Sequence, residues 1–383
     1  MLHVLLGACA LYGAFCLVLF GVNYLTIPRL SRERAAGPGA PLLSIVVPAR
    51  NEERAIGRGV SSLLAQTYPR LEVIVVDDRS TDRTGEILRG LPSDARLRIV
   101  VGEDPPAGWL GKPHALFQGA AVARGELLLF VDADVRYHPE AASQAVGFLE
   151  RRRADFVGLL PKLEAETFWE EVLMPNLLCA VYFGPGFLAN FDRPRSIAGG
   201  SGAGNLVRRS VYDAIGGHAS LRASVIDDLH LAVAAKRAGF RARVVSAQDR
   251  VAVRMYNGFR EVWDGFTKNV AFSVSGVLGI AVLLLLLLST GAALLPLAVL
   301  VAALFGAPIP STDVVLAVAA IAYVVLARTL LALSQGSSVW PAVTHPLMAA
   351  VWAALLARSL YQRYVRRSIV WRGRAFDARK AGF

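Results

Sequence analysis

The stretch SIVVPARNEE at Ser44–Glu53 decides the fold, because an apolar, β-branched run ends abruptly in polar residues. Two further stretches repeat this pattern: VIVVDDRSTDRT at Val73–Thr84 and LLLFVDADV at Leu127–Val135. Short apolar runs bounded by turn-forming residues are typical of buried strands. Amphipathic stretches of helical length separate the runs. The alternation predicts a parallel, doubly wound α/β sheet of the Rossmann-like type.

Four strands and four helices are expected in this region. The strands begin at Leu42, Leu71, Leu97 and Glu126, and the helices occupy about 54–66, 82–90, 111–123 and 138–152. Ligands of such sheets bind beyond the carboxyl ends of the strands. Carboxylates stand there: Asp77-Asp78 after the second strand and Asp132-Ala133-Asp134 after the fourth. A single acidic residue after a strand is usually a helix cap, and Asp82 fits that use.

The pair Asp132 and Asp134 has a more specific use, because two carboxylates one residue apart can share a hard divalent cation. Such an ion, Mg²⁺ or Mn²⁺, leaves positions open for phosphate oxygens and neutralises the charge of a leaving diphosphate. The sequence therefore favours a metal-assisted site for a diphosphate-containing ligand.

Composition places the chain in a membrane. It has 383 residues, of which 54% are hydrophobic, and a mean hydropathy of +0.45, which is too apolar for an ordinary soluble enzyme. Residues Leu2–Leu25 contain no charged side chain and are too long for a signal-peptide core, so we expect an N-terminal membrane anchor over 1–26. A cleaved signal peptide is the alternative interpretation.

A second apolar region runs from Phe272 to about Leu356. Breaks at Ser289–Gly291, at Gly306–Asp313 and at Ser334–Val339 divide it into about four candidate membrane helices, although the first two could form one long helix. Arg328 within it is costly in lipid unless it faces a partner, a cavity or a head group.

The net charge of +11 is concentrated at the membrane boundaries, with Arg29, Arg32 and Arg34 after the first apolar run and a basic tail after the last. Positive charge beside membrane segments marks the cytoplasmic side, so nucleic acid is not expected as a partner. The predicted domains are an anchor at 1–26, a cytoplasmic α/β domain at 27–270, membrane helices at 271–358 and a cytoplasmic tail at 359–383. The expected location is the cell (inner) membrane, crossed several times.

These motifs resemble those of the family 2 glycosyltransferases, which have the GT-A fold. The match includes SIVVPARNEE, VIVVDDRSTDRT, FVDADV and VIDDLHLA from Val225, in the family's order across most of residues 43–245. Flanking features are similar to the membrane-bound subgroup that glycosylates hydrophobic acceptors, including carotenoid-acid, hopanoid-associated and ceramide glucosyltransferase-like enzymes. They are GWLGKPHAL from Gly108, IGGH at 215–218, RMY at 254–256, KN at 268–269, HPL at 345–347 and WRGR at 371–374.

The resemblance implies inverting, metal-dependent transfer of a sugar, with glucose favoured, from a UDP-sugar to a lipid or terpenoid acceptor. It implies that Asp228 is the general base, that Asp134 and Asp132 bind the metal, and that the nucleotide sugar is bound by Pro48, Glu52, Asp78, Lys112 and Asp132. Asp227 belongs to the same acidic pair as Asp228. Trp263 would form a floor under the acceptor or the donor sugar.

The sequence departs from the family pattern at two places. The acidic pair is Asp-Asp where Glu-Asp is common, and Val262 stands before Trp263 where processive and ceramide-type enzymes have arginine, with Arg260 nearby. The second departure weakens the alternative of a processive polysaccharide synthase. A third alternative is a non-catalytic membrane protein that only binds nucleotide sugars. The glycine-rich segment GGSGAG at 199–204 does not fit a dinucleotide loop, and we expect a flexible loop near the acceptor.

Overall fold

The computed structural model describes residues 1–273, 276–371 and 374–377, with side chains described for 1–270 and 287–367. The chain forms two compact units. The sheet unit comprises Ile27–Glu164 and Phe187–Met255, and the helical unit comprises Met1–Thr26, Ala165–Gly186 and the chain from Tyr256 onward. The helical unit thus includes a segment, 165–186, that lies within the predicted α/β domain. The functional assignment of the four predicted domains stays a prediction.

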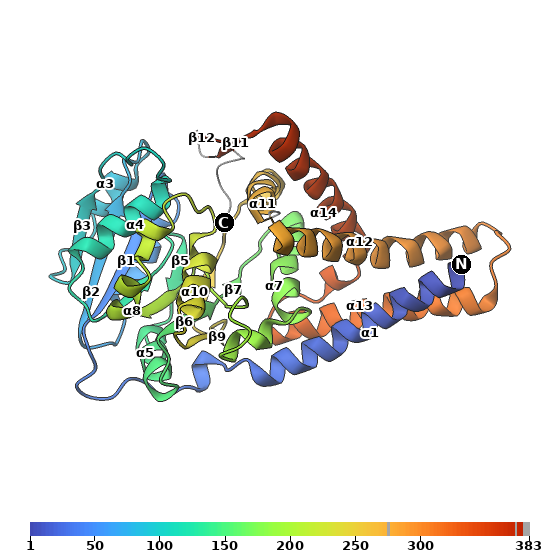
Figure 1. The fold of residues 1–383 in the computed structure, drawn as a ribbon, viewed down its shortest axis with the longest axis horizontal. Helices are drawn as coiled ribbons and strands as arrows, with labels where there is room; N and C mark the ends of the chain where they lie inside the picture. The colour runs from blue at the N-terminus through green and yellow to red at the C-terminus, as the bar shows by residue number, and fades with distance from the viewer. Residues whose placement is uncertain (274–275, 372–373, 378–383) are drawn as a thin grey trace. The chain divides into compact units, whose positions relative to one another are not determined.

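A seven-stranded sheet is the centre of the sheet unit (Figure 1). Its order is β3 (Leu97–Val101), β2 (Leu71–Asp77), β1 (Leu43–Ala49), β4 (Leu127–Phe130), β8 (Asn205–Arg208), β6 (Phe156–Leu160) and β9 (Ala242–Ser246). Strands β3, β2, β1 and β4 are parallel, and β8 is antiparallel to both of its neighbours. The sheet is therefore mixed, and the expected strand–helix alternation is confirmed in its parallel half.

A second, three-stranded sheet completes the sheet unit. It consists of β5 (Val135–Tyr137), β10 (Val251–Val253) and β7 (Lys162–Leu163).

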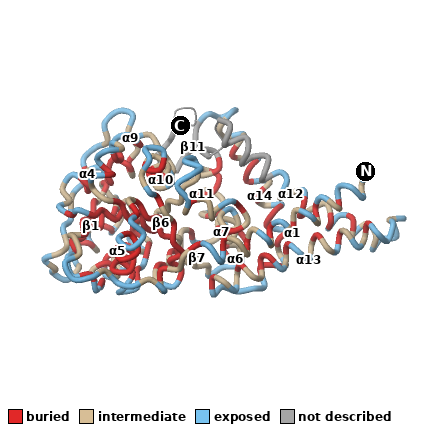
Figure 2. Tube along the Cα trace, turned by 60° about the horizontal axis from the view of Figure 1, so that its bottom comes forward, coloured by how far each residue is buried: buried red, intermediate tan, exposed pale blue. Residues whose placement is uncertain are grey.

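Successive side chains of the strands enter two different cores, which is why the strands are apolar throughout rather than alternating. Ile45 and Val47 belong to one core and Val46 to the other. Residues of α2 (Ile56–Leu64), α3 (Thr84–Arg89) and α5 (Ala141–Arg151) complete the first core, and residues of α4 (Gly111–Val122), α8 (Arg209–Ala214) and α10 (Asp227–Arg237) complete the second. Figure 2 shows buried residues concentrated along β1 and β6.

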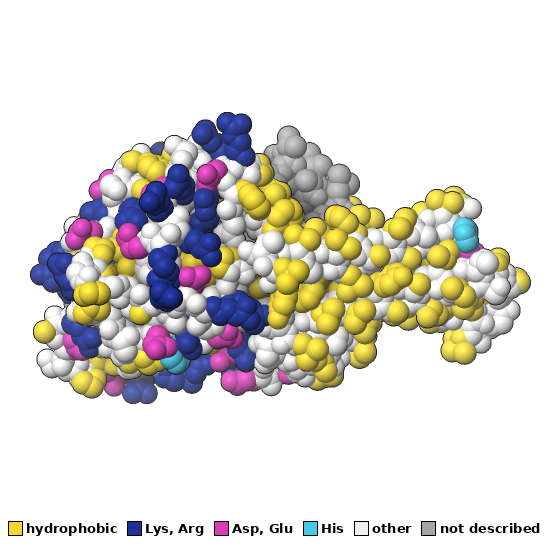
Figure 3. All heavy atoms as spheres, turned by 90° about the horizontal axis from the view of Figure 1, so that it is seen from below, with side chains coloured by type: hydrophobic (Ala, Val, Ile, Leu, Met, Phe, Trp, Pro, Cys, Tyr) yellow, Lys and Arg dark blue, Asp and Glu magenta, His cyan; other side chains and the backbone are white. Residues whose placement is uncertain are grey.

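The helical unit consists mainly of helices. They are α1 (Leu2–Thr26), α11 (Gly258–Ser273), α12 (Gly276–Leu304), α13 (Ser311–Ser334) and α14 (His345–Leu360), with the shorter α6 (Phe168–Leu173) and α7 (Pro175–Tyr182). Within the described residues, three are long and apolar enough to cross a membrane: α1, the Leu287–Leu304 part of α12, and α13. Figure 3 shows hydrophobic side chains over these helices. With 16 residues, α14 reaches only about 24 Å.

The predicted break at Ser289–Gly291 does not occur, because α12 runs through it as one helix that contains Pro296. The first two candidate helices are therefore one helix, as the alternative interpretation allowed, while the number of membrane crossings stays a prediction. A serine and a glycine do not by themselves end a helix, because each costs at most about 1 kcal/mol in a helix interior. Part of the predicted basic tail, including Arg372, lies outside the described residues.

Helix α1 runs parallel to α13 and antiparallel to α12. His3 Nδ1 lies 2.7 Å from Asp313 Oδ1, so the first turns of α1 and α13 meet. Leu6 packs with Val299 and Ala317, whereas Cys9, one turn later, packs with Ala292 and Ala320. A Cβ on Gly13 would collide with Ala320 and Tyr323, so this glycine permits the close approach of α1 to α13.

One buried carboxylate links three segments at the amino edge of the sheet. Glu72 on β2 is 6% exposed. It accepts hydrogen bonds from Ser44 Oγ on β1 at 2.6 Å and from the backbone N–H and Nε of Arg124 at 2.6 and 3.0 Å. Burial by itself raises the pKa of Glu72, but these hydrogen bonds outweigh it and hold the pKa below its usual value.

We predict that Glu72→Gln lowers the free energy of unfolding by about 1–3 kcal/mol, because the amide NH₂ would face donors that now bind a carboxylate. A lowered folded-state pKa stabilises the protein above the unfolded pKa of about 4.3 and is lost as the pH falls below it. The difference in melting temperature between variant and wild type should therefore shrink below about pH 4.

The matched control is Glu86→Gln, whose carboxylate is 64% exposed and pairs only with exposed Arg83. It should leave the melting temperature close to that of the wild type, because exposed ion pairs contribute little to stability. Equal melting temperatures for Glu72→Gln and Glu86→Gln at neutral pH would contradict the structural role of Glu72.

Candidate active site

The carboxyl ends of β1, β2 and β4 meet at one edge of the sheet, as the parallel pairing requires. Ala49 is in register with Asp77, so the loop after β1 lies beside the loop after β2. Hydrogen bonds join the two loops: the N–H of Thr81 donates to Asn51 Oδ1 at 2.8 Å, and the N–H of Glu52 donates to Thr84 Oγ1 at 2.7 Å. Pro48 and Glu52 are thereby held beside the DD motif, and their role in binding the nucleotide stays a prediction.

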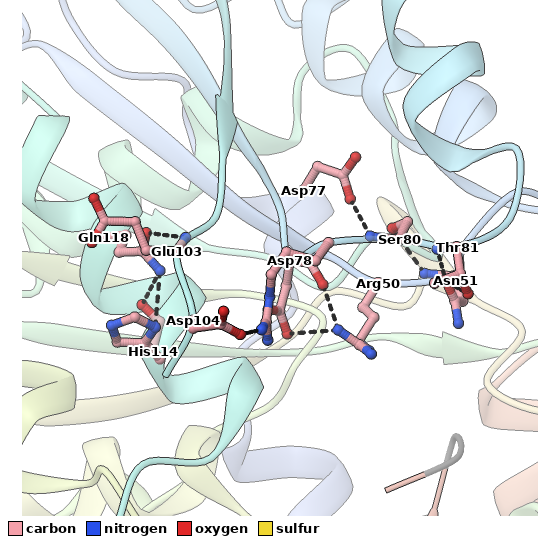
Figure 4. A network of polar contacts seen from close by, with 11 residues as sticks. Arg50, Asn51, Asp77, Asp78, Ser80, Thr81, Glu103, Asp104, His114 and Gln118 are labelled. Atoms are coloured by element: carbon pink, nitrogen blue, oxygen red, sulfur yellow. Dashed lines mark hydrogen bonds and ion pairs between the residues drawn. The ribbon is translucent and has the colours of Figure 1, made fainter. Parts of the chain in front are cut away.

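Asp78 lies in this joined region and is 5% exposed (Figure 4). Its carboxylate is 3.0 Å from Nη2 of Arg79 and 3.8 Å from Nη1 of Arg50. Arg50 also donates to the Asp78 carbonyl at 2.7 Å, which fixes the turn. The sequence analysis missed both arginines, because a basic residue in a polar loop is normally solvated. Together with Asp78 they form a network of charged contacts beside the sheet.

Lys112 bridges two acidic motifs that are distant in the sequence. It stands in the first turn of α4, where the helix dipole disfavours a cation, so carboxylates must hold it there. Its Nζ lies 2.7 Å from Asp132 Oδ1 and 3.7 Å from Asp227 Oδ1. Burial lowers the pKa of Lys112, but Asp132, Asp227 and Asp228 together raise it well above its usual value. The side chain is still 37% exposed, so a ligand can reach it.

Asp227 is the buried member of the acidic pair, at 2% exposure. Burial raises its pKa to about 7, against the opposing effect of Lys112. Nε2 of His218 lies 3.9 Å from Oδ2 of Asp227, and burial lowers the pKa of His218 to about 3, so this ring is neutral. Asp227 Oδ1 receives no hydrogen bond from the described part of the chain, which leaves an acceptor directed at the site.

Asp228 is the more accessible member of the pair. It lies in the first turn of α10, where the positive end of the helix dipole favours a carboxylate. Its Oδ1 accepts from the N–H of Leu229 at 2.8 Å, and its carbonyl accepts from Asn205 Nδ2 at 3.0 Å. One buried and one accessible carboxylate are thus available side by side.

The glycine-rich loop at 199–204 touches both acidic motifs. The carbonyl of Gly202 accepts the N–H of Asp132 at 2.7 Å, and a Cβ on Gly202 would collide with the Asp132 carboxylate. A Cβ on Gly200 would collide with the backbone of Asp228. The loop can approach both motifs only because these positions lack side chains.

A buried lysine anchors the segment that leads into this loop. Lys236 on α10 is 1% exposed, and its ammonium donates to the carbonyls of Leu188 at 3.0 Å, Ala189 at 3.2 Å and Ile197. Burial lowers its pKa to about 8. No pattern in the sequence indicates this role, because lysine in the last turn of a helix is normally a solvated C-terminal residue.

Asp134 and Trp263 complete the predicted site residues. Asp134 lies half-buried at the end of the DAD motif, and its metal role stays a prediction. Trp263 belongs to the helical unit, where it stacks on Phe259 with ring centroids 5.6 Å apart and has the Arg358 guanidinium at 5.6 Å. Its role as a sugar floor also stays a prediction.

Residues 44–216 match the protein-family model described as Glycosyl transferase family 2. The chain carries a family 2 glycosyltransferase domain. Among curated proteins, it is 27% identical over 295 residues to a 4,4'-diaponeurosporenoate glycosyltransferase of Staphylococcus haemolyticus, covering 76% of each chain. It is 30% identical over 238 residues to the protein of the same name from Staphylococcus aureus, covering 61% of this chain and 62% of that protein.

A solved structure confirms the GT-A fold of this glycosyltransferase. It is a mannosyltransferase of Pyrobaculum calidifontis in complex with GDP-Man and Mn²⁺, with a TM-score of 0.56 and 20% identity. The match covers 95% of this chain and all of that one.

We predict that Gly202→Ala lowers kcat/KM of the glycosyltransferase by about 100-fold or more, because a displacement of about 1 Å in Asp132 is enough for such a loss. The measurement is sugar transfer or donor hydrolysis by the purified full chain. Gly37→Ala is the matched control, since nothing lies within 4 Å of a Cβ at that position. Full activity in Gly202→Ala would show that the loop does not position Asp132.

Proposed function

We propose that the enzyme transfers a sugar, with inversion and with a divalent metal, from a UDP-sugar to a lipid or terpenoid acceptor at the cytoplasmic membrane face. The observation that carries this proposal is the contact of Lys112 with Asp132 and Asp227, beside the accessible Asp228. This arrangement combines a cation for phosphate oxygens, carboxylates for a metal and a free carboxylate for the acceptor.

The donor is proposed to lie along the edge of the sheet. Pro48, Glu52 and Asp78 would bind the nucleotide, and Lys112 would contact its diphosphate. The ammonium of Lys112 is partly exposed, so it could contact a diphosphate while it stays close to the carboxylates. UDP-glucose is the first donor to test.

The donor atoms fit a hard cation. The side chains around Lys112 are carboxylates, and three of them act on a single ammonium, which leaves the cluster negative. No group of three or more His, Cys, Asp or Glu within the described residues could hold a metal alone. Asp132 and Asp134 would therefore hold Mg²⁺ or Mn²⁺ together with oxygens of the donor. Such an ion would stabilise the negative charge of the leaving diphosphate.

Asp228 is proposed to act on the acceptor. The acceptor oxygen attacks the anomeric carbon as the bond to the diphosphate breaks, and Asp228 takes the proton of an acceptor hydroxyl. One displacement inverts the configuration. If the acceptor is a carboxylic acid instead, Asp228 would accept a hydrogen bond from it and orient it. The two relatives are named for a carotenoid acid, which supports a terpenoid acceptor.

The proposed topology follows from the helix directions. Because α1 and α13 run parallel and α12 runs antiparallel, an N-terminus outside the cell places the end of α1 and the end of α13 on the cytoplasmic side. Arg29 follows α1, and Arg358 stands in the last turn of α14, after the two C-terminal membrane helices. Both positions agree with the positive-inside rule. Any even number of C-terminal crossings returns the chain to the cytoplasm, so two crossings satisfy this requirement just as four do.

Asp228→Asn should retain donor binding but lower turnover by about 10²- to 10⁴-fold, the usual contribution of a general base. The assay is nucleotide release from UDP-glucose, UDP-galactose, UDP-GlcNAc and GDP-mannose by the full chain in detergent, with Mg²⁺ or Mn²⁺ and a total lipid extract. EDTA should abolish the release. Asp249→Asn, an exposed carboxylate that bonds Ser31, should remain fully active. Undiminished turnover in Asp228→Asn with a hydroxyl acceptor would refute the assigned base.

A cysteine-labelling experiment tests the topology. In a variant that lacks the three native cysteines, Thr312→Cys should react with an impermeant maleimide in intact spheroplasts, because it lies at the start of α13 beside His3. Ser93→Cys, an exposed residue of the sheet unit, should react only after lysis. The opposite pattern would invert the proposed orientation.

A further inference from the structure

Helix α13 contains a cation inside an otherwise apolar membrane span. Arg328 is 3% exposed, so its side chain does not extend along the helix surface to water or lipid. Its Nη1 lies 2.6 Å from the sulfur of Met348 and 3.4 Å from Nδ1 of His345. A thioether is a weak acceptor, and a single ring nitrogen can satisfy at most one of the five guanidinium N–H groups.

The described part of the chain shows no counter-charge beside this guanidinium. From position 265 to position 376, Asp313 is the only acidic residue. It is 15 residues before Arg328 on the same helix, about 22 Å away, and it pairs with His3. Elsewhere in the helical unit, Asp264 pairs with Arg358. In the described part of the chain no carboxylate lies within ion-pair distance of Arg328.

A buried cation without a partner is expensive, and removal from water costs several kcal/mol or more per ion. An apolar residue of similar size would pack at this position without that cost. Ionisable side chains inside membrane helices therefore mark binding sites or pathways more often than they mark packing.

A small cavity of about 10 Å³ with an apolar wall adjoins His345. Val324 and Val325 of α13 line it with Ala292 of α12, and His345 is the polar side chain of its lining. The two valines precede Arg328 by one turn, and side chains on a helix lean toward the turn before them. Arg328 and His345 thus lie at one end of this small apolar cavity among α12, α13 and α14.

We propose that Arg328 and His345 bind the oxyanion, a carboxylate or a phosphate, of an anionic amphiphile whose apolar chain lies along α12, α13 and α14. The depth fits a head group: Arg328 lies six residues, about 9 Å, before the end of α13, on the proposed cytoplasmic side. The oxyanion supplies the charge and acceptors that the chain lacks, and His345 donates or accepts beside it. This binding does not require transferase activity, and it rests on the proposed function only if the oxyanion belongs to the acceptor.

The test measures binding by the full chain in uncharged detergent, without any nucleotide sugar. All-trans-retinoic acid supplies a terpenoid carboxylate and dioleoylphosphatidic acid supplies a lipid phosphate. Retinol and dioleoylglycerol are their uncharged counterparts. Native mass spectrometry gives the bound fraction, and the ligand-induced rise in melting temperature gives a second readout.

We expect the wild type to bind at least one acid with a measurable thermal shift, and to bind its uncharged counterpart at least about tenfold more weakly. Arg328→Met should weaken binding of the acid about 10- to 100-fold, the effect of losing hydrogen bonds to a charged group. Arg328→Lys should retain part of the affinity. Arg366→Met removes an equal charge from an exposed position and should bind like the wild type.

Loss of retinoic acid binding alone identifies a carboxylate site, loss of phosphatidic acid binding alone a phosphate site, and loss of both a general oxyanion site. If Arg328→Met does not fold, two measurements replace it. One is acid binding by His345→Gln, and the other compares binding of each acid with binding of its uncharged counterpart by the wild type. Equal binding of acids and counterparts by the wild type, or equal acid binding by Arg328→Met, would overturn the proposal. Neither result would affect the donor-release assay, so the two proposals fail separately.

Discussion

The arrangement of the active site depends on one ammonium group among several carboxylates. Asp132, Asp227 and Asp228 come from two segments about 95 residues apart, and their like charges would repel if nothing stood between them. Lys112 contacts two of them and lowers the energy of the whole group. The same balance leaves the cluster with surplus negative charge, which suits a divalent cation and a ligand that brings its own phosphates.

The positions of these carboxylates are set by backbone rather than by further charged partners. Gly202 holds the backbone of Asp132, Gly200 lies against Asp228, and Lys236 fixes the carbonyls that precede the loop. The contact of Gly200 with Asp228 tolerates very little change, because it is between main-chain atoms with no flexible side chain to absorb a displacement. The loop therefore connects two motifs that no strand pairing brings into contact.

The helical unit follows different physics. Its helices pack through small residues such as Gly13, because in lipid there is no water to expel from between apolar surfaces. A charged side chain buried among these helices is not hydrated, and a partner must offset the free energy lost on its removal from water. Among the described residues, Arg328 has no acidic partner, while His3 and Asp313 at the far end of α13 do form a pair. The His3–Asp313 pair joins two helix ends within the chain, whereas Arg328 is proposed to bind an anion from outside the chain.

The sequence by itself determined the strand–helix alternation, the parallel half of the sheet, the GT-A family and the acidic motifs at the strand ends. These features follow from local periodicity and from the rule that parallel strands end at the same edge. The antiparallel β8, the continuity of α12 and the burial of Asp227 beside an accessible Asp228 were decided by the tertiary structure. Arg50, Arg79, His218 and Lys236 act through contacts with residues far away in the chain, and no spacing rule reports such contacts. Burial and desolvation are properties of the folded whole, which is why only the structure could assign them.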